Sequence, residues 1–402
     1  MKDMRELFPF FEHNKNITYL DNANTTQILG SCLSSYIKYY YNFNYNIGRA
    51  SYTGARMAQQ IKDWALASAG KFLGTEASNI IFTSGATEGL NLVAYSICNT
   101  LKQEHKRATL LTTELEHASA ILPWMAFGKN VIDIQFIKMT DDYCLTVDNL
   151  KAAISKYKPD ILLLASMTNT TSEVRPLKEI GKVAKEHDII FVVDHAQGAA
   201  HVPISVDEYN IDYLSCSLHK MYGPKGLGIL YARHPETLRP MRLGGGMNQW
   251  FEKDGTFEIQ EGNERFAAGT EDVPVYCAAM EAIDFVMSNW EQIKIHDVYL
   301  GTFAYGLLSR VPGVEIYSKK GSPIVLFNVK DKEALDVMEQ LDNDNIYIRA
   351  GNHCSKLTKD LFGLSTCRVS LGIYNTEEDL MRLYKALKGE PLEKMNEEKR
   401  EL

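Results

Sequence analysis

A serine, a histidine and a lysine stand where an apolar run of the sequence gives way to a tight turn. The run "IDYLSC" (211–216) has the composition of a buried strand, and Ser217, His219 and Lys220 follow it before a Gly-Pro pair. A lysine amine that is partly withdrawn from water binds its proton less tightly and becomes a nucleophile for a carbonyl group. Lys220 is therefore a candidate for Schiff-base chemistry, although a single lysine is far more often a solvated surface charge.

Four other apolar runs also end in polar residues. "NIIFTS" precedes "GATEG" (85–89), and the runs at 109–113, 161–166 and 189–193 precede His117, Asn169 and the pair Asp194 and Gln197. Amphipathic segments such as "PLKEIGKVAKEH" alternate with these runs, which predicts a mainly parallel sheet with helices on its faces. Because ligands bind beyond the carboxyl ends of such strands, we expect the polar residues to share one crevice.

The stretch "SGATEG" has the features of a phosphate site. Small residues and a threonine at a helix start leave main-chain N–H groups pointing outward, and the helix dipole attracts an anion. Taken alone, such a stretch is more often a helix N-terminus without a ligand. The sequence contains neither GxGxxG nor GxxxxGK[ST], so the usual nucleotide-binding patterns are missing.

Asp194 ends the most apolar run in the chain. An aspartate there most often caps the following helix, but it is also the partner that the ring nitrogen of pyridoxal phosphate needs. Combined with a phosphate cup, His117, Asn169 and the Lys220 amine, it favours pyridoxal 5′-phosphate as the cofactor. The competing lysine, Lys225, lies beyond the turn and is expected to be exposed or directed at a phosphate.

Length and charge limit the other possibilities. The 402 residues exceed the roughly 250–300 at which single cores stop growing, so we expect a larger domain over 20–275 and a smaller one from 1–19 and 276–402. A net charge of −8 argues against a nucleic-acid partner. No run approaches the ~20 apolar residues of a membrane span, and the charged N-terminus lacks a signal-peptide core. Seven cysteines without metal-ligand spacing predict free thiols in the cytoplasm and no metal site.

The pattern changes near residue 275. A long helix is predicted over 273–290, followed by shorter units with strands near 314–317, 324–329, 345–349 and 367–371. This part is interpreted as the smaller domain, with the N-terminal arm packed on it.

These stretches resemble a known family. The likeness runs over nearly the whole chain, from "YLDNANTTQ" (19–27) through "TTELEHAS", "VDHAQGAAH", "SCSLHKMYGPKGLGILY" and "RFAAGT" to "IRAGNHC" and "CRVSLGIYNTEEDL". It is similar to the fold-type-I pyridoxal-phosphate enzymes of the class V aminotransferase group, and within them to cysteine desulfurases of the Suf type. The resemblance implies a large domain with a mainly parallel seven-stranded sheet, a smaller C-terminal α/β domain that carries the active cysteine, and a homodimer.

Position by position, the resemblance also implies the site residues. The phosphate would be held by the Ala86 main chain, Thr87, Ser217, His219 and, across a dimer interface, Thr270. The cofactor ring would be contacted by His117, Asp194 and Gln197. Lys220 would form the Schiff base, and the substrate carboxylate would be positioned by Asn169, Arg349 and Arg368, since arginine suits planar carboxylate recognition.

The chain departs from the family pattern at several positions. Asn24 stands where alanine is usual, His195 where glycine or alanine is common, and Asn352 where histidine is common. "NIGRASY" (46–52) replaces a segment that usually carries two histidines, so that Gly48 and Tyr52 change that stretch. These departures leave the substrate range and the acceptor protein open.

Cys354 decides between reactions that this cofactor supports. Cys98, Cys216 and Cys277 lie in apolar patterns and are expected to be inert, and Cys367 fits the start of a strand. Cys354 instead lies in the polar loop "RAGNHCSKLTKD" (349–360), whose positive charges favour the reactive thiolate. A loop cysteine without a role is the competing interpretation, but the R-x-G-x-H-C frame of the family favours a nucleophile.

The resemblance therefore implies a cysteine desulfurase that converts L-cysteine to L-alanine with a persulfide on Cys354. It would pass sulfur to an acceptor or scaffold protein of iron–sulfur cluster assembly. The short loop between Cys354 and Arg368 favours the Suf branch over the Nif/Isc branch. Selenocysteine lyase, cysteine sulfinate desulfinase and transaminase activities remain open, as does an inactive homologue that only binds partners, against which the intact Lys220, Asp194 and His117 argue.

Overall fold

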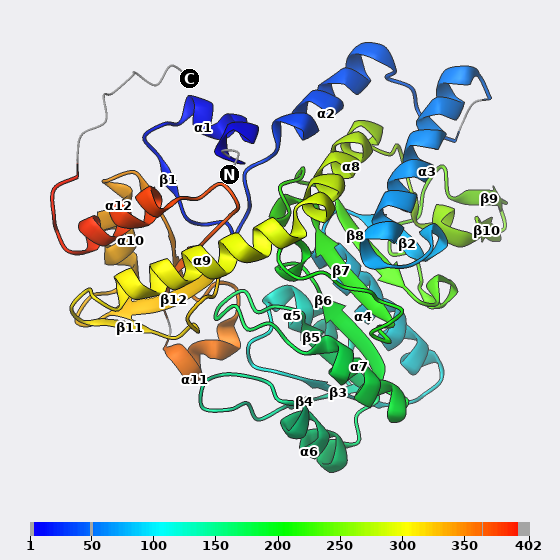
Figure 1. Cartoon of the computed structure of the whole chain (residues 1–402). Coiled ribbons are helices and arrows are strands. Elements are labelled where there is room, and N and C mark those ends of the chain that lie inside the picture. The colour runs from blue at the N-terminus through cyan, green and yellow to red at the C-terminus, as the bar shows by residue number, and fades with distance from the viewer. Residues whose placement is uncertain (1–3, 49–50, 364, 393–402) are drawn as a thin grey trace. The chain divides into compact units, whose positions relative to one another are not determined.

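The computed structural model describes residues 4–48, 51–363 and 365–392 (Figure 1). Its internal contacts divide the chain into two compact units. The larger unit comprises residues 26–168 and 174–290, and the smaller unit comprises residues 4–25, 169–173 and 291–392. The domain limits expected from the sequence, 20–275 for the larger domain and 1–19 with 276–402 for the smaller one, stay a prediction.

A seven-stranded sheet forms the centre of the larger unit within the described residues, in the order β2-β8-β7-β6-β5-β3-β4. The strands are β2 (Ile80–Thr83), β3 (Ala108–Thr112), β4 (Ile132–Phe136), β5 (Ile161–Ala165), β6 (Ile190–Asp194), β7 (Tyr213–Ser217) and β8 (Gly228–Ala232). Neighbouring strands from β7 to β4 are parallel, while β8 is antiparallel to β2 and to β7. The predicted mainly parallel, seven-stranded architecture is thereby confirmed.

The central strands are apolar because helices and loops cover them. Every residue of β5 ("ILLLA") and of β8 ("GILYA") is buried, as strands of covered parallel sheets usually are. Helix α4 (Ala86–Gln103) packs on β7, on β8 and on α5 (Ala118–Phe127). Helices α6 (Val147–Tyr157) and α7 (Leu177–Glu186) pack on β3 and β6, respectively.

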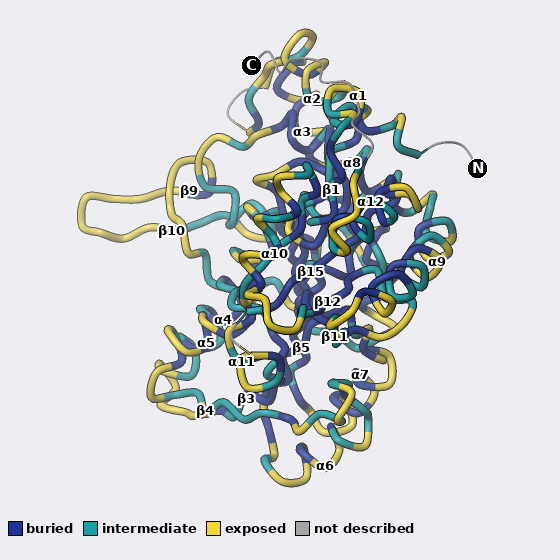
Figure 2. The backbone as a smooth tube through the Cα atoms, turned by 90° about the vertical axis from the view of Figure 1, so that its left-hand side faces the viewer, coloured by how far each residue is buried: buried dark blue, intermediate teal, exposed yellow. Residues whose placement is uncertain are grey.

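Three further helices and a hairpin complete the larger unit. Helices α2 (Gly30–Asn42) and α3 (Thr53–Leu73) both pack against α8 (Val273–Ser288). The long helix predicted over 273–290 therefore ends at Ser288, and α9 (Trp290–Leu308) begins two residues later. Strands β9 (Asn248–Phe251) and β10 (Phe257–Ile259) pair as an antiparallel hairpin that is exposed along most of its length (Figure 2).

The smaller unit contains an antiparallel sheet in the order β11-β12-β15-β14 and a separate parallel pair, β1 with β13. The strands are β1 (Thr18–Tyr19), β11 (Val314–Ile316), β12 (Ile324–Val329), β13 (Ile346–Tyr347), β14 (Arg349–Gly351) and β15 (Thr366–Ser370). The single strand predicted near 345–349 is thus two short strands in different sheets. The reason is pairing: Ile346 lies opposite Thr18, whereas Arg349 lies opposite Arg368.

Helices pack on this sheet and bury one apolar core. Helices α9, α10 (Ala334–Asp342) and α12 (Glu377–Leu387) contribute to this core, and the unit also contains α1 (Pro9–His13) and α11 (Lys359–Phe362). The core includes Leu20, Leu300, Val325, Phe327 and Val369. No helix among the described residues is long and apolar enough to cross a membrane.

Candidate active site

Strand direction brings most of the predicted site residues to one edge of the large sheet. Because β2 and β7 are both antiparallel to β8, β2 runs in the same direction as β7, β6, β5 and β3. The residues after these strands therefore follow carboxyl ends that share one edge. Asn169 is different, since by its contacts residues 169–173 belong to the smaller unit.

The start of α4 meets the end of β7. The Ala86 N–H donates to Ser217 Oγ at 2.7 Å, so the structure brings together two of the residues predicted to hold the phosphate. Gly228 on β8 allows this approach, because a Cβ atom there would lie 2.5 Å from Gly85 Cα. The main-chain N–H groups at the start of a long helix such as α4 are a suitable site for an anion.

His117 is fixed at the start of α5. Its Nδ1 accepts the Ser119 N–H at 3.1 Å, so the neutral ring carries its proton on Nε2. The Ser119 hydroxyl also lies 2.8 Å from Thr87 Oγ1. The structure therefore links two predicted cofactor residues, Thr87 and His117, through one serine.

A buried ion pair that the sequence analysis missed lies directly before His117. Glu116 and Arg175 are fully buried, with 2.5 Å between Oε1 and Nη1. Glu116 Oε2 accepts the Ala165 N–H at 2.7 Å, and the Thr113 hydroxyl donates to Oε1 at 2.6 Å. The network ties the end of β3 to the end of β5. Glu116 lies in the stretch "TTELEHAS" that the sequence analysis quoted, but nothing in the sequence indicates Arg175 as its partner.

Asp194 is a buried carboxylate at the end of β6, accepting the Ala196 N–H at 2.9 Å. Burial raises its pKa to about 6, while the Ala196 N–H and the charge of Lys220 act in the opposite direction. Such a group is stabilised in its ionised form by a cation placed beside it. A protonated ring nitrogen is a cation of the right kind, so the residue fits the predicted cofactor.

Lys220 lies in a short 3-10 turn, Leu218–Lys220, at the end of β7. The N–H groups of Met221 and Gly223 both donate to the Leu218 carbonyl, and the Thr26 N–H donates to the His219 carbonyl at 2.9 Å. Burial and the charges of Lys220 and Lys225 lower the pKa of His219 to about 4, so its ring is neutral at pH 7. Thr26, which the sequence analysis did not single out, supports the lysine turn.

Gln197 and His195 follow Asp194 in the chain. Gln197 is buried and precedes the 3-10 turn Gly198–Ala200. His195, one of the departures from the family pattern, is fully buried, with Nδ1 2.8 Å from Ser166 Oγ. Burial lowers its pKa to about 3, so this ring is also neutral at pH 7.

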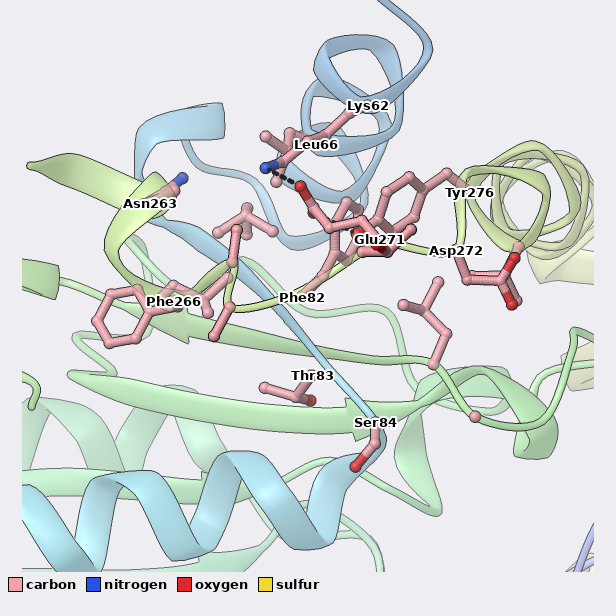
Figure 3. Close-up of a pocket in the computed structure, with 18 of the residues that line it drawn as sticks. Lys62, Leu66, Phe82, Thr83, Ser84, Asn263, Phe266, Glu271, Asp272 and Tyr276 are labelled. Atoms are coloured by element: carbon pink, nitrogen blue, oxygen red, sulfur yellow. Dashed lines mark hydrogen bonds and ion pairs between the residues drawn. The ribbon is translucent and has the colours of Figure 1, made fainter. Parts of the chain in front are cut away.

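Thr270 lies in the segment that precedes α8. It is exposed and lines a pocket of about 180 Å³ with Lys62 and Glu271 (Figure 3). Lys62 is buried and donates to Glu264 at 2.9 Å and to Glu271 at 3.0 Å, which anchors the segment that carries Thr270. The role implied for Thr270 concerns a second copy of the chain and stays a prediction.

Arg368, in the smaller unit, is a buried guanidinium with one donor to spare. Its Nη1 donates to the Asn169 carbonyl at 2.9 Å and its Nη2 to Asp21 Oδ1 at 3.1 Å. Burial lowers its pKa to about 10 against the effect of Asp21, so it stays charged at neutral pH. Its buried Nε has no partner among the described residues and can donate to a substrate carboxylate.

Cys354 lies in a turn with an uncommon backbone. The Ser355 N–H donates to the Asn352 carbonyl at 2.8 Å, which closes the turn over His353 and Cys354. These two residues have φ values of 51° and 59°, the left-handed pair that a type I′ turn requires. Left-handed backbone costs a side-chain-bearing residue roughly 1–2 kcal/mol, so other contacts must hold the turn.

Asn169 supplies two of these contacts. Its Nδ2 donates to the His353 carbonyl at 2.8 Å, and its Oδ1 accepts the Ser355 hydroxyl at 2.9 Å. It therefore holds the residues on both sides of Cys354, and its own carbonyl holds Arg368. Two groups predicted for the substrate carboxylate and the predicted nucleophile thus share one hydrogen-bonded network.

The thiol itself meets an arginine. Arg349 Nη2 lies 3.2 Å from Cys354 Sγ, in hydrogen-bond range for sulfur, and Nη1 lies 3.4 Å from Asn24 Oδ1. The role of Asp21 and of Asn24 was missed by the sequence analysis, although both belong to the quoted stretch "YLDNANTTQ". Both residues lie far from Arg349 and Arg368 in the sequence, so no local pattern indicated these contacts.

The other cysteines provide a contrast. All seven lie in the described residues and are free. Burial raises the pKa of Cys98 to about 11 and the pKa values of Cys32, Cys216 and Cys367 to about 12, so these groups are neutral thiols at pH 7. Cys277 was expected to be buried but is only half-buried.

The stretch that replaces the family's two histidines is described only in part. Gly48 has a left-handed φ of 75°, and the exposed ring of Tyr52 packs edge-on against Tyr45 at 5.9 Å. Residues 49 and 50 lie outside the described chain.

Comparison with known proteins identifies the family of the chain. Residues 18–383 match the profile of the family Aminotransferase class-V. A probable cysteine desulfurase of Halalkalibacterium halodurans is 32% identical over 399 residues, which is 96% of each chain. One of Staphylococcus epidermidis is 32% identical over 394 residues, 95% of this chain and 94% of that one.

Solved structures of similar proteins lead to the same group. The apo cysteine desulfurase of Thermococcus onnurineus superimposes with a TM-score of 0.89 at 27% identity, over 96% of this chain and 97% of that one. The cysteine desulfurase CsdA of Escherichia coli superimposes with a TM-score of 0.85 at 26% identity, over 96% of both chains.

Proposed function

Because the chain belongs to the aminotransferase class-V family, we propose that it is a cysteine desulfurase of the Suf type. It converts L-cysteine to L-alanine and keeps the sulfur as a persulfide on Cys354. The observation that carries the proposal is the position of Asn169, which binds Arg368 and both neighbours of Cys354. A carboxylate-binding group and a nucleophile with a common support suit a small amino-acid substrate that contains sulfur.

The expected cofactor is pyridoxal 5′-phosphate, and its residues belong to the larger unit. Lys220 would bind its aldehyde, Asp194 its ring nitrogen and Gln197 its ring oxygen, and His117 would contact the ring. The Ala86 N–H, Thr87, Ser217 and His219 would hold the phosphate. When bound, the cofactor withdraws electrons from the substrate Cα and makes the proton there removable. The fit is supported by the buried Asp194 carboxylate, because a cation beside it would stabilise its ionised form.

The protein's own groups then have distinct tasks. Arg368 binds the substrate carboxylate through its open Nε donor, and Asn169 and Arg349 orient the same group. Lys220 Nζ, as a neutral amine, takes the Cα proton. His117, whose Nδ1 is engaged by Ser119, can move a proton at Nε2.

Sulfur transfer takes place at Cys354. Its thiolate attacks the substrate sulfur, so that a new S–S bond forms while the Cβ–S bond breaks. The electron pair of the broken bond stays on Cβ, which takes up a proton and becomes the methyl group of alanine. The Arg349 guanidinium, 3.2 Å from Sγ, is placed to donate to the sulfur anion before and after transfer.

The persulfide requires an acceptor. We propose that a thiol of a scaffold or carrier protein takes the sulfur, and that the destination is iron–sulfur cluster assembly in the cytoplasm. The role implied for Thr270 requires a homodimer, in which each copy contributes a phosphate ligand to the other.

Product analysis tests the proposal. The purified protein, carrying its cofactor, is given L-cysteine, and alanine is measured together with the mass of the Cys354 peptide. We expect alanine and a Cys354 peptide heavier by one sulfur atom. Cys354→Ser should lose both products, whereas Cys144→Ser, which removes another partly exposed thiol, should lose neither.

Other outcomes would replace the proposal. A keto acid would indicate transamination, and alanine without any need for Cys354 would indicate a lyase or desulfinase mechanism. A protein without products and without the visible absorption of a bound cofactor would be an inactive binding partner.

A further inference from the structure

The turn that carries Cys354 depends on the side chain of the residue that opens it. Asn352 Oδ1 accepts the Cys354 N–H at 3.0 Å, and its carbonyl accepts the Ser355 N–H at 2.8 Å. An asparagine that binds the main chain two residues further on stabilises a turn in just this manner. Asn352 itself is exposed, so packing does not impose this conformation on it.

The residues on either side of Cys354 are anchored more firmly than Cys354 is. His353 is buried and its Nε2 lies 2.9 Å from Thr366 Oγ1, while Ser355 is buried and bonded to Asn169. Cys354 is only half-buried between them. The main-chain N–H of Cys354 itself is held by Asn352, which adds to the contacts that Asn169 makes with its two neighbours.

The conformation of Cys354 decides where its sulfur points. At a φ of 59° the thiol lies 3.2 Å from Arg349 Nη2. A residue with a side chain prefers negative φ, and a change of that size would rotate the Cα–Cβ bond and move the sulfur away. The guanidinium is held from its other side, since Nη1 lies near Asn24 Oδ1 and Asn24 Nδ2 donates to Asp21 at 3.0 Å.

We propose that Asn352 is a positioning residue for the chemistry of Cys354. By accepting the Cys354 N–H it keeps the turn left-handed, and the turn keeps the sulfur against the Arg349 guanidinium. The inference rests on the proposed function for the identity of the electrophile, which is the sulfur of L-cysteine. The reactivity of the thiol towards a simple alkylating agent follows from the geometry alone.

Alkylation by iodoacetamide, without cysteine present, isolates this geometry. The full-length protein with its cofactor is labelled, and the rate at each cysteine is read from its peptide. Asn352→Leu removes the acceptor at similar size, and we expect labelling of Cys354 to slow about fivefold, the value of one lost hydrogen bond. Cys144 should react at its normal rate and the buried Cys367 should stay unlabelled, which shows that the fold is intact.

Two variants complete the series. Asn352→Ser keeps an oxygen that can accept the same N–H, and we expect it to label Cys354 within about twofold of the natural protein. Asn343→Leu, at an exposed asparagine after α10, should have no effect. In alanine production, Asn352→Leu should lower kcat and leave KM and the visible absorption of the cofactor unchanged.

A double variant asks whether Asn352 acts through Arg349. Arg349→Gln alone should also slow alkylation, and adding Asn352→Leu should then have little further effect, because the contact is already lost. Additive slowing, or normal labelling of Cys354 in Asn352→Leu, would overturn the proposal. Normal labelling with no alanine from the natural protein would contradict the proposed function instead, so the two failures are distinguishable.

Discussion

The two units position their chemical groups by different means. In the larger unit, Asp194 and Lys220 follow the ends of hydrogen-bonded strands, and His117 begins a helix, so regular structure fixes where each side chain starts. In the smaller unit, Cys354 lies in an irregular turn whose shape depends on contacts from Asn169 and Asn352. A substitution at a site residue of the larger unit should remove only the chemical group that is replaced. A substitution in the smaller unit should also displace a neighbouring group that the replaced side chain held.

This difference has a chemical meaning. A cofactor that stays in place benefits from a support that does not move. A cysteine that accepts sulfur and passes it on must react twice, with different partners, and a turn held by a few hydrogen bonds can be adjusted one contact at a time. The comparison predicts effects of different sizes for the substitutions below.

Replacing Lys220 by alanine should have the largest effect. Because we propose that the residue both binds the cofactor and removes a proton, we expect turnover to fall by about a millionfold, as for other catalytic groups that act as a unit. The visible absorption of the bound cofactor should vanish. Lys225→Ala, beyond the turn, is the control and should retain activity. Alkylation of Cys354 should stay normal in Lys220→Ala, and slower labelling would show that the two supports are not separate.

Breaking the buried pair of Glu116 and Arg175 should strongly lower the free energy of unfolding of the larger unit. Glu116→Gln leaves the guanidinium without a counter-charge, and we expect the free energy of unfolding in urea to fall by about 3–5 kcal/mol. Glu208→Gln breaks an exposed pair with Lys178 and should leave the unfolding curve unchanged. Equal curves for both variants would mean that strand pairing alone fixes this edge of the sheet.

Asp194→Asn should stabilise the cofactor-free protein. The pKa of Asp194 is raised to about 6, whereas in the unfolded chain an aspartate loses its proton near pH 4. Its charge therefore destabilises the fold progressively from about pH 4 to pH 6, and fully above pH 6, by about 3 kcal/mol. The variant should unfold at higher urea than the natural protein at pH 7 and at similar urea near pH 4. Parallel curves across this range would contradict the burial effect.

A helix cap in the smaller unit should give the smallest effect. Thr376 Oγ1 accepts the Asp379 N–H and Asp379 accepts the Thr376 N–H, which forms a capping box at the start of α12. Thr376→Ala should lower the free energy of unfolding by about 1 kcal/mol, and Thr376→Ser should restore most of it. Labelling of Cys354 should be normal in both, whereas slower labelling would extend the support of the turn as far as this helix.

The part of the site that follows regular structure could be predicted from the sequence. Apolar runs that end in polar residues identified Asp194, Gln197 and Lys220, because the end of a strand is visible as a change in composition. The seven-stranded sheet followed from the alternation of runs and from the family resemblance. The antiparallel direction of β8 was not predicted, because no local sequence pattern indicates the direction in which a strand runs.

The parts of the site that the sequence analysis missed depend on contacts between residues that are distant in the sequence. Glu116 and Arg175 form a pair across two strand ends, and Asn24 meets Arg349. One sequence alone does not show which distant residues form such contacts. The left-handed turn was also invisible, because His353 and Cys354 are not the glycine or asparagine that usually mark positive φ.

The burial of the other cysteines has a consequence for a protein that carries activated sulfur. A persulfide exchanges with thiolates, and the rate of exchange depends on how much thiolate is present. Cys32, Cys98, Cys216 and Cys367 are held as neutral thiols by burial, so they compete poorly for that sulfur. Burial thus protects these four thiols from exchange within the molecule, and under the proposed function the sulfur on Cys354 stays available to an acceptor protein from outside.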